Sequence, residues 1–259
     1  MITIAIVLNE ELWAERAIES GDMGKKPYET ICRVAKYYFH QNHSKKEVRG
    51  LLDSFLLKCN PSVSLTKWSD TLDYAVSVAA KRKLLVADSI TITEPEIERI
   101  RGLSGAQLQR LAFTLLCLAK YWKLANPNSD WWVNNDDSEV MKLANINTSI
   151  KRQCLLYHDL KNQNMIQFSK KIDNTNVRVL FSQSGKAALE ITDFRNLGNQ
   201  YQLYLGDPKF IKCESCGLVI RSKNTSPDGI VMVGRKQKYC DQCAGKRILY
   251  TDIPMGVVS

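Results

Sequence analysis

Four cysteines near the end of the sequence have the spacing of metal ligands. Cys213 and Cys216 form one CxxC pair, Cys240 and Cys243 form a second, and 23 residues separate the two pairs. The two residues inside each pair allow both thiolates to turn toward one point, and Gly217 supplies backbone freedom for such a turn. Four thiolates complete the tetrahedral shell of Zn²⁺ and leave no open position for catalysis. The pattern therefore predicts one structural zinc ion.

The segment that carries these cysteines, residues 207–259, is too short to bury a large core. We expect the metal to supply much of its folding free energy. Between the two pairs we expect a hairpin, with strands at 218–222 and 230–233. The segment resembles a zinc ribbon, or a treble-clef variant if a helix begins at Cys243. The basic residues that we assign here to a nucleic-acid surface are Arg235, Lys236 and Lys238, and docking of this module on a protein stays open.

The middle of the chain predicts a definite order of helices and strands. A helix with a broad apolar face at 103–126 precedes a short strand at 131–133. A helix at 136–146 and a polar turn lead into a second helix at 150–166. A strand, a polar turn and another strand complete the order near Phe181.

This order, together with the stretch DSEVMKLANINTSIKRQCLLYHDLKNQNMIQF at 137–168, resembles the winged helix-turn-helix family. The resemblance implies that the second helix of the motif enters the DNA major groove with its first residues toward the bases. Residues 151–186 hold seven basic and two acidic side chains, a net charge of +5. This charge favours DNA as the partner, although small winged helices also bind proteins.

Side chains of the kinds that contact bases and phosphates gather in this motif. At the start of its second helix the candidates are Asn147, Thr148, Ser149, Lys151, Arg152 and Gln153. Further along the helix and in the wing they are Lys161, Lys170, Lys171, Asn174, Asn176 and Arg178. The apolar residues that we expect to pack inward are Ile150, Leu155, Leu156, Leu160 and Ile166.

The remainder of the chain predicts mostly helix. Apolar residues recur at helical spacing in 27–41, 44–60 and 65–84, and 88–93 alternates as a strand does. We interpret the first 13 residues as a buried strand, and 182–206 as a short helix followed by an extended segment. The fold class is therefore mainly α with small β elements. We expect an N-terminal helical domain at 1–102, a winged helix-turn-helix with a bridging segment at 103–206, and a zinc ribbon at 207–259.

The charge of the chain is unevenly distributed. The net charge is +9, with an isoelectric point near 9.1. Residues 1–102 hold 15 basic and 14 acidic side chains, whereas 207–259 hold nine and five. A localised basic excess favours a polyanionic partner. We expect the four other cysteines to be reduced and buried: Cys32, Cys59, Cys117 and Cys154.

These features predict a cytoplasmic, non-catalytic protein that binds double-stranded DNA. The sequence holds no phosphate loop, HExxH or GxSxG motif, so we do not expect an enzyme. The role would be transcription regulation, or replication or recombination as an accessory factor. The module order resembles that of small proteins from phages and mobile elements of Gram-positive bacteria. The alternative is an adaptor whose zinc module and winged helix dock on a polymerase, a helicase or another protein. A protein partner of residues 1–102 and a homodimer stay open, and no membrane contact is expected.

Overall fold

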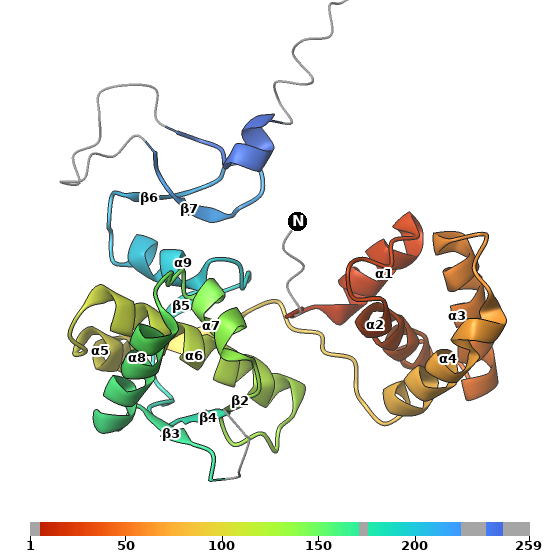
Figure 1. Cartoon of the computed structure of the whole chain (residues 1–259), viewed down its shortest axis with the longest axis horizontal. Coiled ribbons are helices and arrows are strands. Elements are labelled where there is room, and N and C mark those ends of the chain that lie inside the picture. The colour runs from red at the N-terminus through yellow and green to blue at the C-terminus, as the bar shows by residue number, and fades with distance from the viewer. Residues whose placement is uncertain (1–5, 171–175, 224–236, 246–259) are drawn as a thin grey trace, which may run out of the picture. The chain divides into compact units, whose positions relative to one another are not determined.

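The computed structural model describes residues 6–170, 176–223 and 237–245 of the 259-residue chain. The chain is mainly helical with small sheets, as the sequence predicts, and it divides into two compact units, Met1–Ser89 and Ile90–Ser259 (Figure 1). The division falls earlier than the expected boundary after residue 102. The reason is that the strand and helix at 90–101 pair and pack within the second unit.

Over residues 6–89 the first unit contains four helices: α1 (Glu10–Ser20), α2 (Pro27–His40), α3 (Lys45–Cys59) and α4 (Leu65–Ala79). Ser44 and Glu47 form a capping box at the start of α3, the helix expected at 44–60. The core is apolar and includes the fully buried Val34, Leu52 and Leu72.

The strand interpretation of the first 13 residues is wrong from Glu10 onward, because α1 begins there. Before it, Asn9 forms an isolated β-bridge with Val86, and residues 1–5 lie outside the described part of the chain. The Asn9 side chain accepts a hydrogen bond from the Leu12 N–H, 3.0 Å away, and so caps the helix. Acidic residues in the first turn, Glu10 and Glu11, further favour a helix at this point.

The second unit opens with a two-stranded sheet formed by segments far apart in sequence. Strand β1 (Ile90–Thr93) pairs antiparallel with β5 (Ala187–Ile191), and α5 (Glu94–Arg101) follows β1 directly. The order expected for 182–206 is reversed, since the strand comes first and helix α9 (Leu197–Tyr204) follows. Pairing with β1 makes 187–191 extended, a long-range cause that local periodicity does not reveal.

Helix α6 (Ala106–Ala125) forms the centre of this unit. Four consecutive residues, Phe113, Thr114, Leu115 and Leu116, are fully buried, and because successive residues are about 100° apart they face all sides of the helix. The elements that follow are β2 (Trp132–Val133), α7 (Asp137–Leu143), α8 (Ile150–Asn162), β3 (Ile166–Phe168) and β4 (Val177–Val179). The three strands form one antiparallel sheet in the order β2-β4-β3. These are the elements that the sequence predicts, in the predicted order.

A buried ion pair joins several of these elements. The Glu96 side chain is completely buried, and the Lys120 Nζ lies 2.8 Å from its carboxylate. The same carboxylate accepts hydrogen bonds from the backbone N–H groups of Thr93, at 2.8 Å, and Gln183, at 3.0 Å, and from the Ser182 hydroxyl at 3.1 Å. Glu96 therefore fixes α5, α6 and the segment before β5 to one another.

The described part of the C-terminal module consists of β6 (Phe210–Lys212), β7 (Val219–Arg221) and a helical turn at 241–245. The expected strand at 218–222 is present, but it pairs with β6. Its expected partner at 230–233 lies outside the described residues. Among the described helices of the chain, none combines the length and apolar character needed to cross a lipid bilayer.

Candidate metal centre and nucleic-acid interface

The structure brings the four predicted metal ligands together. The sulfur atoms of Cys213, Cys216, Cys240 and Cys243 all lie within 4.8 Å of one another, and those of Cys216 and Cys240 are 3.7 Å apart. Tetrahedral coordination with metal–sulfur bonds of about 2.3 Å requires sulfur–sulfur distances of about 3.8 Å. The four thiols thus fit a structural metal ion.

The turn between β6 and β7 positions the first pair of cysteines. We call this turn together with the first residue of β7, residues 213–219, the metal knuckle. The Gly217 N–H donates to the Cys213 carbonyl oxygen at 2.9 Å, and Gly217 has φ +72°, a conformation that suits glycine. The second pair lies at the helical turn 241–245, and the Cys240 N–H donates to the Cys213 sulfur at 3.3 Å. Both pairs therefore belong to one hydrogen-bonded unit.

The electrostatics of the thiols suit a cation. Burial raises the pKa of the Cys213 thiol, but the backbone N–H groups of Cys240, Cys216 and Ser215 donate to its sulfur and lower the pKa to about 6. At Cys243 the Ser215 side chain lowers the pKa, but the neighbouring cysteine side chains outweigh it and raise the pKa to about 11. Four adjacent thiols do not all ionise without compensation, so a bound cation would displace protons from them.

Side chains at the start of α9 and just before it hold the metal knuckle through hydrogen bonds to backbone oxygens. The Arg195 guanidinium donates to the Cys216 carbonyl at 2.8 Å. The Asn196 and Asn199 side-chain amides both donate to the Val219 carbonyl, at 2.9 and 3.3 Å. An ion pair to Asp193, at 2.6 Å, orients the Arg195 guanidinium. The position of the knuckle relative to α9 is thus fixed by polar contacts.

The same contacts continue to the turn between α7 and α8. The Asn145 amide nitrogen donates to the Asn196 side-chain oxygen at 3.2 Å, and the Asn145 side-chain oxygen accepts from the Asn199 N–H at 3.3 Å. We call Asn145, Asn196 and Asn199 the amide clamp. Gly198 permits the close approach, because a Cβ atom there would lie 1.9 Å from the Ala144 carbonyl oxygen. The clamp therefore joins the metal knuckle to the turn that precedes α8.

Sequence reasoning did not identify the amide clamp as a site. Asn145 and Asn196 both have a positive φ, +54° and +53°. Asparagine tolerates this conformation better than most residues. An asparagine directly after a helical pattern, as at Asn145, was therefore the sequence signal for a residue of this conformation.

The predicted nucleic-acid residues on α8 and after it fall into two groups. Members of the first group are exposed. Asn147, Lys151, Arg152 and Lys170 belong to it, and neither Lys151 nor Arg152 forms an ion pair with a described residue. Lys161 is exposed as well, with its ammonium 5.4 Å from the centroid of the Phe168 ring. This group leaves positive charge available at the first turn of α8.

Members of the second group have partners within the chain. The Ser149 hydroxyl accepts from the Arg152 N–H and caps α8, and the Gln153 amide donates to the Thr148 carbonyl at 2.9 Å. The Asn176 amide donates to the Asn134 side chain at 2.7 Å. Arg178 forms a 2.8 Å ion pair with Asp130, and Lys238 forms a 3.4 Å ion pair with Glu214. The candidates outside the described residues are Lys171, Asn174, Arg235 and Lys236.

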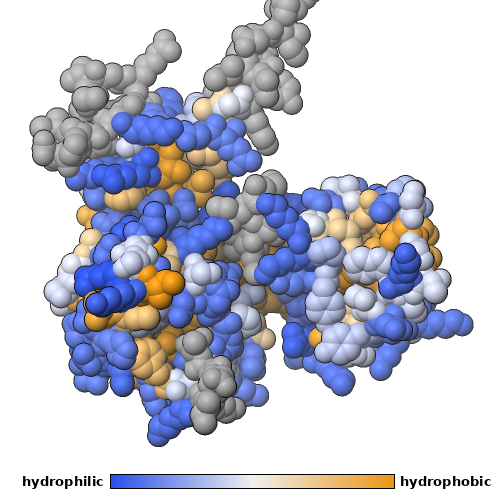
Figure 2. Space-filling view, in the orientation of Figure 1, coloured by the Kyte–Doolittle hydropathy of each residue, from blue (hydrophilic) through white to orange (hydrophobic). Residues whose placement is uncertain are grey.

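Two apolar residues of α8 point away from the core, contrary to expectation. Ile150 is 78% exposed and Leu155 is 46% exposed, whereas Leu156, Leu160 and Ile166 are buried as expected. Residues on opposite sides of one helix cannot face the same core. Cys154 is also exposed on this helix, although we expected it to be buried. On the face shown in Figure 2, hydrophobic residues adjoin strongly hydrophilic ones over α8.

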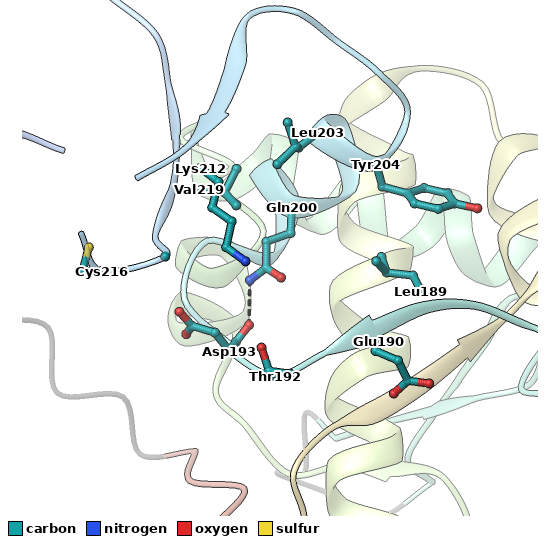
Figure 3. Close-up of a pocket in the computed structure, with 11 residues that line it drawn as sticks. Leu189, Glu190, Thr192, Asp193, Gln200, Leu203, Tyr204, Lys212, Cys216 and Val219 are labelled. Carbon is teal, nitrogen blue, oxygen red and sulfur yellow. Dashed lines mark hydrogen bonds between the residues drawn. The ribbon is translucent and has the colours of Figure 1, made fainter. Parts of the chain in front are cut away.

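A cavity of about 360 Å³ lies between β5, α9 and the metal knuckle (Figure 3). Its charged lining residues include Glu190, Asp193 and Lys212. Glu190 accepts a hydrogen bond from the Thr91 hydroxyl, and Asp193 pairs with Arg195. Both carboxylates therefore have partners within the chain.

Comparison of the chain with protein-family models, with curated proteins and with solved structures found no match.

Proposed function

We propose that this protein binds double-stranded DNA without catalysing a reaction on it, as a winged helix-turn-helix protein. The support from topology is the order α6, β2, α7, α8, β3, β4 with strands in the order β2-β4-β3. In such a motif α8 enters the major groove and the β3–β4 hairpin forms the wing. The role is that of a transcription regulator, or of an accessory factor in replication or recombination.

The observation that carries this proposal is the first turn of α8. Lys151 and Arg152 are exposed there, and no described residue neutralises either charge. The Ser149 cap fixes the start of the helix and so the direction of both side chains. Basic residues that are both positioned and unpaired can contact phosphates or base edges without first breaking an ion pair.

The bound metal in this proposal is one structural Zn²⁺. Zinc is the ion that most often occupies a closed four-thiolate site in proteins, and the sulfur–sulfur distance of 3.7 Å suits it. The helical turn at 241–245 places Cys243 at the start of a helix, which favours the treble-clef variant over the plain ribbon. Zinc would hold the knuckle in shape and take no part in a reaction.

The test is fluorescence anisotropy of the zinc-loaded chain on random duplex DNA, from about 50 to 300 mM salt. Each phosphate contact adds about 0.9 to the slope of log affinity against log salt concentration, so a Lys151→Glu/Arg152→Glu variant should lower the slope by about 2. The matched control is Lys45→Glu/Lys46→Glu. These two exposed basic residues follow the capped start of α3 in the first unit and should leave the slope unchanged.

Absent or salt-insensitive binding would overturn the proposal and leave the adaptor alternative. Exposed Ile150 and Leu155 favour that alternative, because an apolar helix face is suited to a protein partner. In that case Ile150→Ser should abolish capture of a polymerase, helicase or other partner, whereas reversal of the neighbouring charges should not.

A further inference from the structure

The first unit carries two stacked tyrosines at its surface. Tyr28, in the first turn of α2, is 40% exposed, and Tyr74, on α4, is 61% exposed. Their ring centroids lie 6.1 Å apart with an interplanar angle of 23°. Exposed large aromatic rings leave apolar area in water, so a stacked pair of them is a candidate contact surface.

The pair is held in place by the helices below it. Helices α2 and α4 pack against each other through buried residues such as Ile31 and Leu72. The Tyr28 hydroxyl is hydrogen-bonded with the Cys32 thiol one turn later, and this bond, with burial, raises the pKa of Tyr28 to about 12. An aromatic surface whose rings are already ordered loses little conformational entropy when a flat ligand stacks on it.

Positive charge lies beside the tyrosine pair. Lys81, Arg82 and Lys83 follow the end of α4, all three are exposed, and none forms an ion pair with a described residue. Arg82 is close enough to Tyr28 to lower its pKa electrostatically. Of the acidic residues next to the pair in sequence, Asp73 forms an ion pair with Arg49 and Glu29 forms one with Lys26, and only Asp70 has no ion pair with a described residue. The three basic residues therefore exceed the acidic charge that is not already paired.

We propose that this surface binds single-stranded nucleic acid, with a base stacked on Tyr74 and the backbone phosphates on Lys81, Arg82 and Lys83. A flat aromatic ring next to unpaired basic residues matches the two parts of a nucleotide, the π-face of the base and the charge of the phosphate. In a duplex the neighbouring base pairs cover the base faces, so this chemistry selects single strands. The inference concerns the first unit and is separate from duplex binding by α8.

The experiment uses the full chain with Lys151→Glu/Arg152→Glu, so that α8 does not contribute. A labelled oligodeoxythymidylate of about 15 nucleotides is compared with an abasic oligomer of the same length, which keeps the phosphates and lacks the bases. Stacking should make the thymidylate bind about tenfold more tightly or better. Tyr74→Ala should remove this difference, and Tyr74→Phe should retain it because the ring remains.

The control is Leu12→Ala, which truncates another exposed side chain of the same unit on α1 and should change neither affinity. Because Tyr74 is largely exposed, its truncation should leave the fold intact, and the circular dichroism spectrum checks this. Equal affinities for the thymidylate and the abasic oligomer would overturn the inference. So would a base-dependent affinity that Tyr74→Ala leaves unchanged. Neither result bears on duplex binding by α8, which the salt titration measures.

Discussion

Replacement of Gly198 by alanine tests the contact between α7 and α9. A Cβ atom at this position would lie 1.9 Å from the Ala144 carbonyl oxygen and 2.5 Å from its carbon. Carbon–oxygen contacts of this kind settle at about 3.3 Å, so the two backbones must separate by more than about 1 Å. Both contacting atoms belong to the backbone, and no side-chain rotation relieves the clash.

The expected loss of stability follows from the contacts that this separation breaks. Forced overpacking costs about 1–3 kcal/mol. The two hydrogen bonds of Asn145, to Asn196 and from Asn199, are already 3.2 and 3.3 Å long and would break. Each contributes about 1 kcal/mol. Alanine recovers up to about 1 kcal/mol through its helix propensity, so we expect a net loss of about 2–4 kcal/mol.

Hydrogen exchange read by mass spectrometry measures this loss in each unit separately. Peptides of α7, α8 and α9 should exchange about 30- to 700-fold faster, while those of residues 6–89 should not change. The matched control is Gly102→Ala in the same unit. Its Cβ would lie 3.5 Å from the nearest atom, the Arg99 carbonyl oxygen, which is an ordinary contact. Gly102→Ala should change the free energy of opening by less than about 0.5 kcal/mol. A change as small as this in Gly198→Ala would refute the account of the clamp.

Three further predictions concern other parts of the second unit. The chain should bind one zinc ion, as metal analysis would show, and Cys213→Ser or a chelator should remove it. Backbone amides of the C-terminal module should then lose their protection from hydrogen exchange, and a metal-free module whose amides stayed protected would contradict this. Glu96→Gln should cost about 3–5 kcal/mol in urea denaturation, because it leaves the largely buried Lys120 without its charged partner. A Glu96→Gln/Lys120→Met variant places the same amide beside Thr93, Ser182 and Gln183, so if it were no more stable than Glu96→Gln, the unpaired charge would not be the cause. Iodoacetamide should label exposed Cys154 quickly and spare Cys117, whose pKa is raised by complete burial; equal labelling rates in peptide mapping would contradict the structure.

The features that the sequence predicted well are those with local causes. The helix expected at 44–60 is present as α3, and its start is fixed by the capping box of Ser44 with Glu47, whose hydrogen bonds span only three residues. The two CxxC pairs predicted a cluster because the chemistry of thiolates restricts their arrangement. Helical spacing likewise located α2, α3, α4 and α6 to within a few residues.

The features that the sequence did not reveal depend on distant partners. Strand β5 is extended because β1 lies beside it, almost one hundred residues earlier in the chain. Ile150 and Leu155 were expected in the core because they are apolar, but the core faces the opposite side of α8. The clamp residue Asn145 has partners in a helix that begins at 197, and no spacing rule links the two.

The contacts that Arg195, Asn196 and Asn199 make with the metal knuckle end on main-chain oxygens, those of Cys216 and Val219. The strength of these hydrogen bonds depends on the path of the knuckle backbone and not on the side chains that the knuckle carries. Another CxxC turn with the same backbone path could therefore be exchanged into this position and dock in the same way. Arg195, Asn196 and Asn199 thus recognise a backbone path and not a particular set of knuckle side chains.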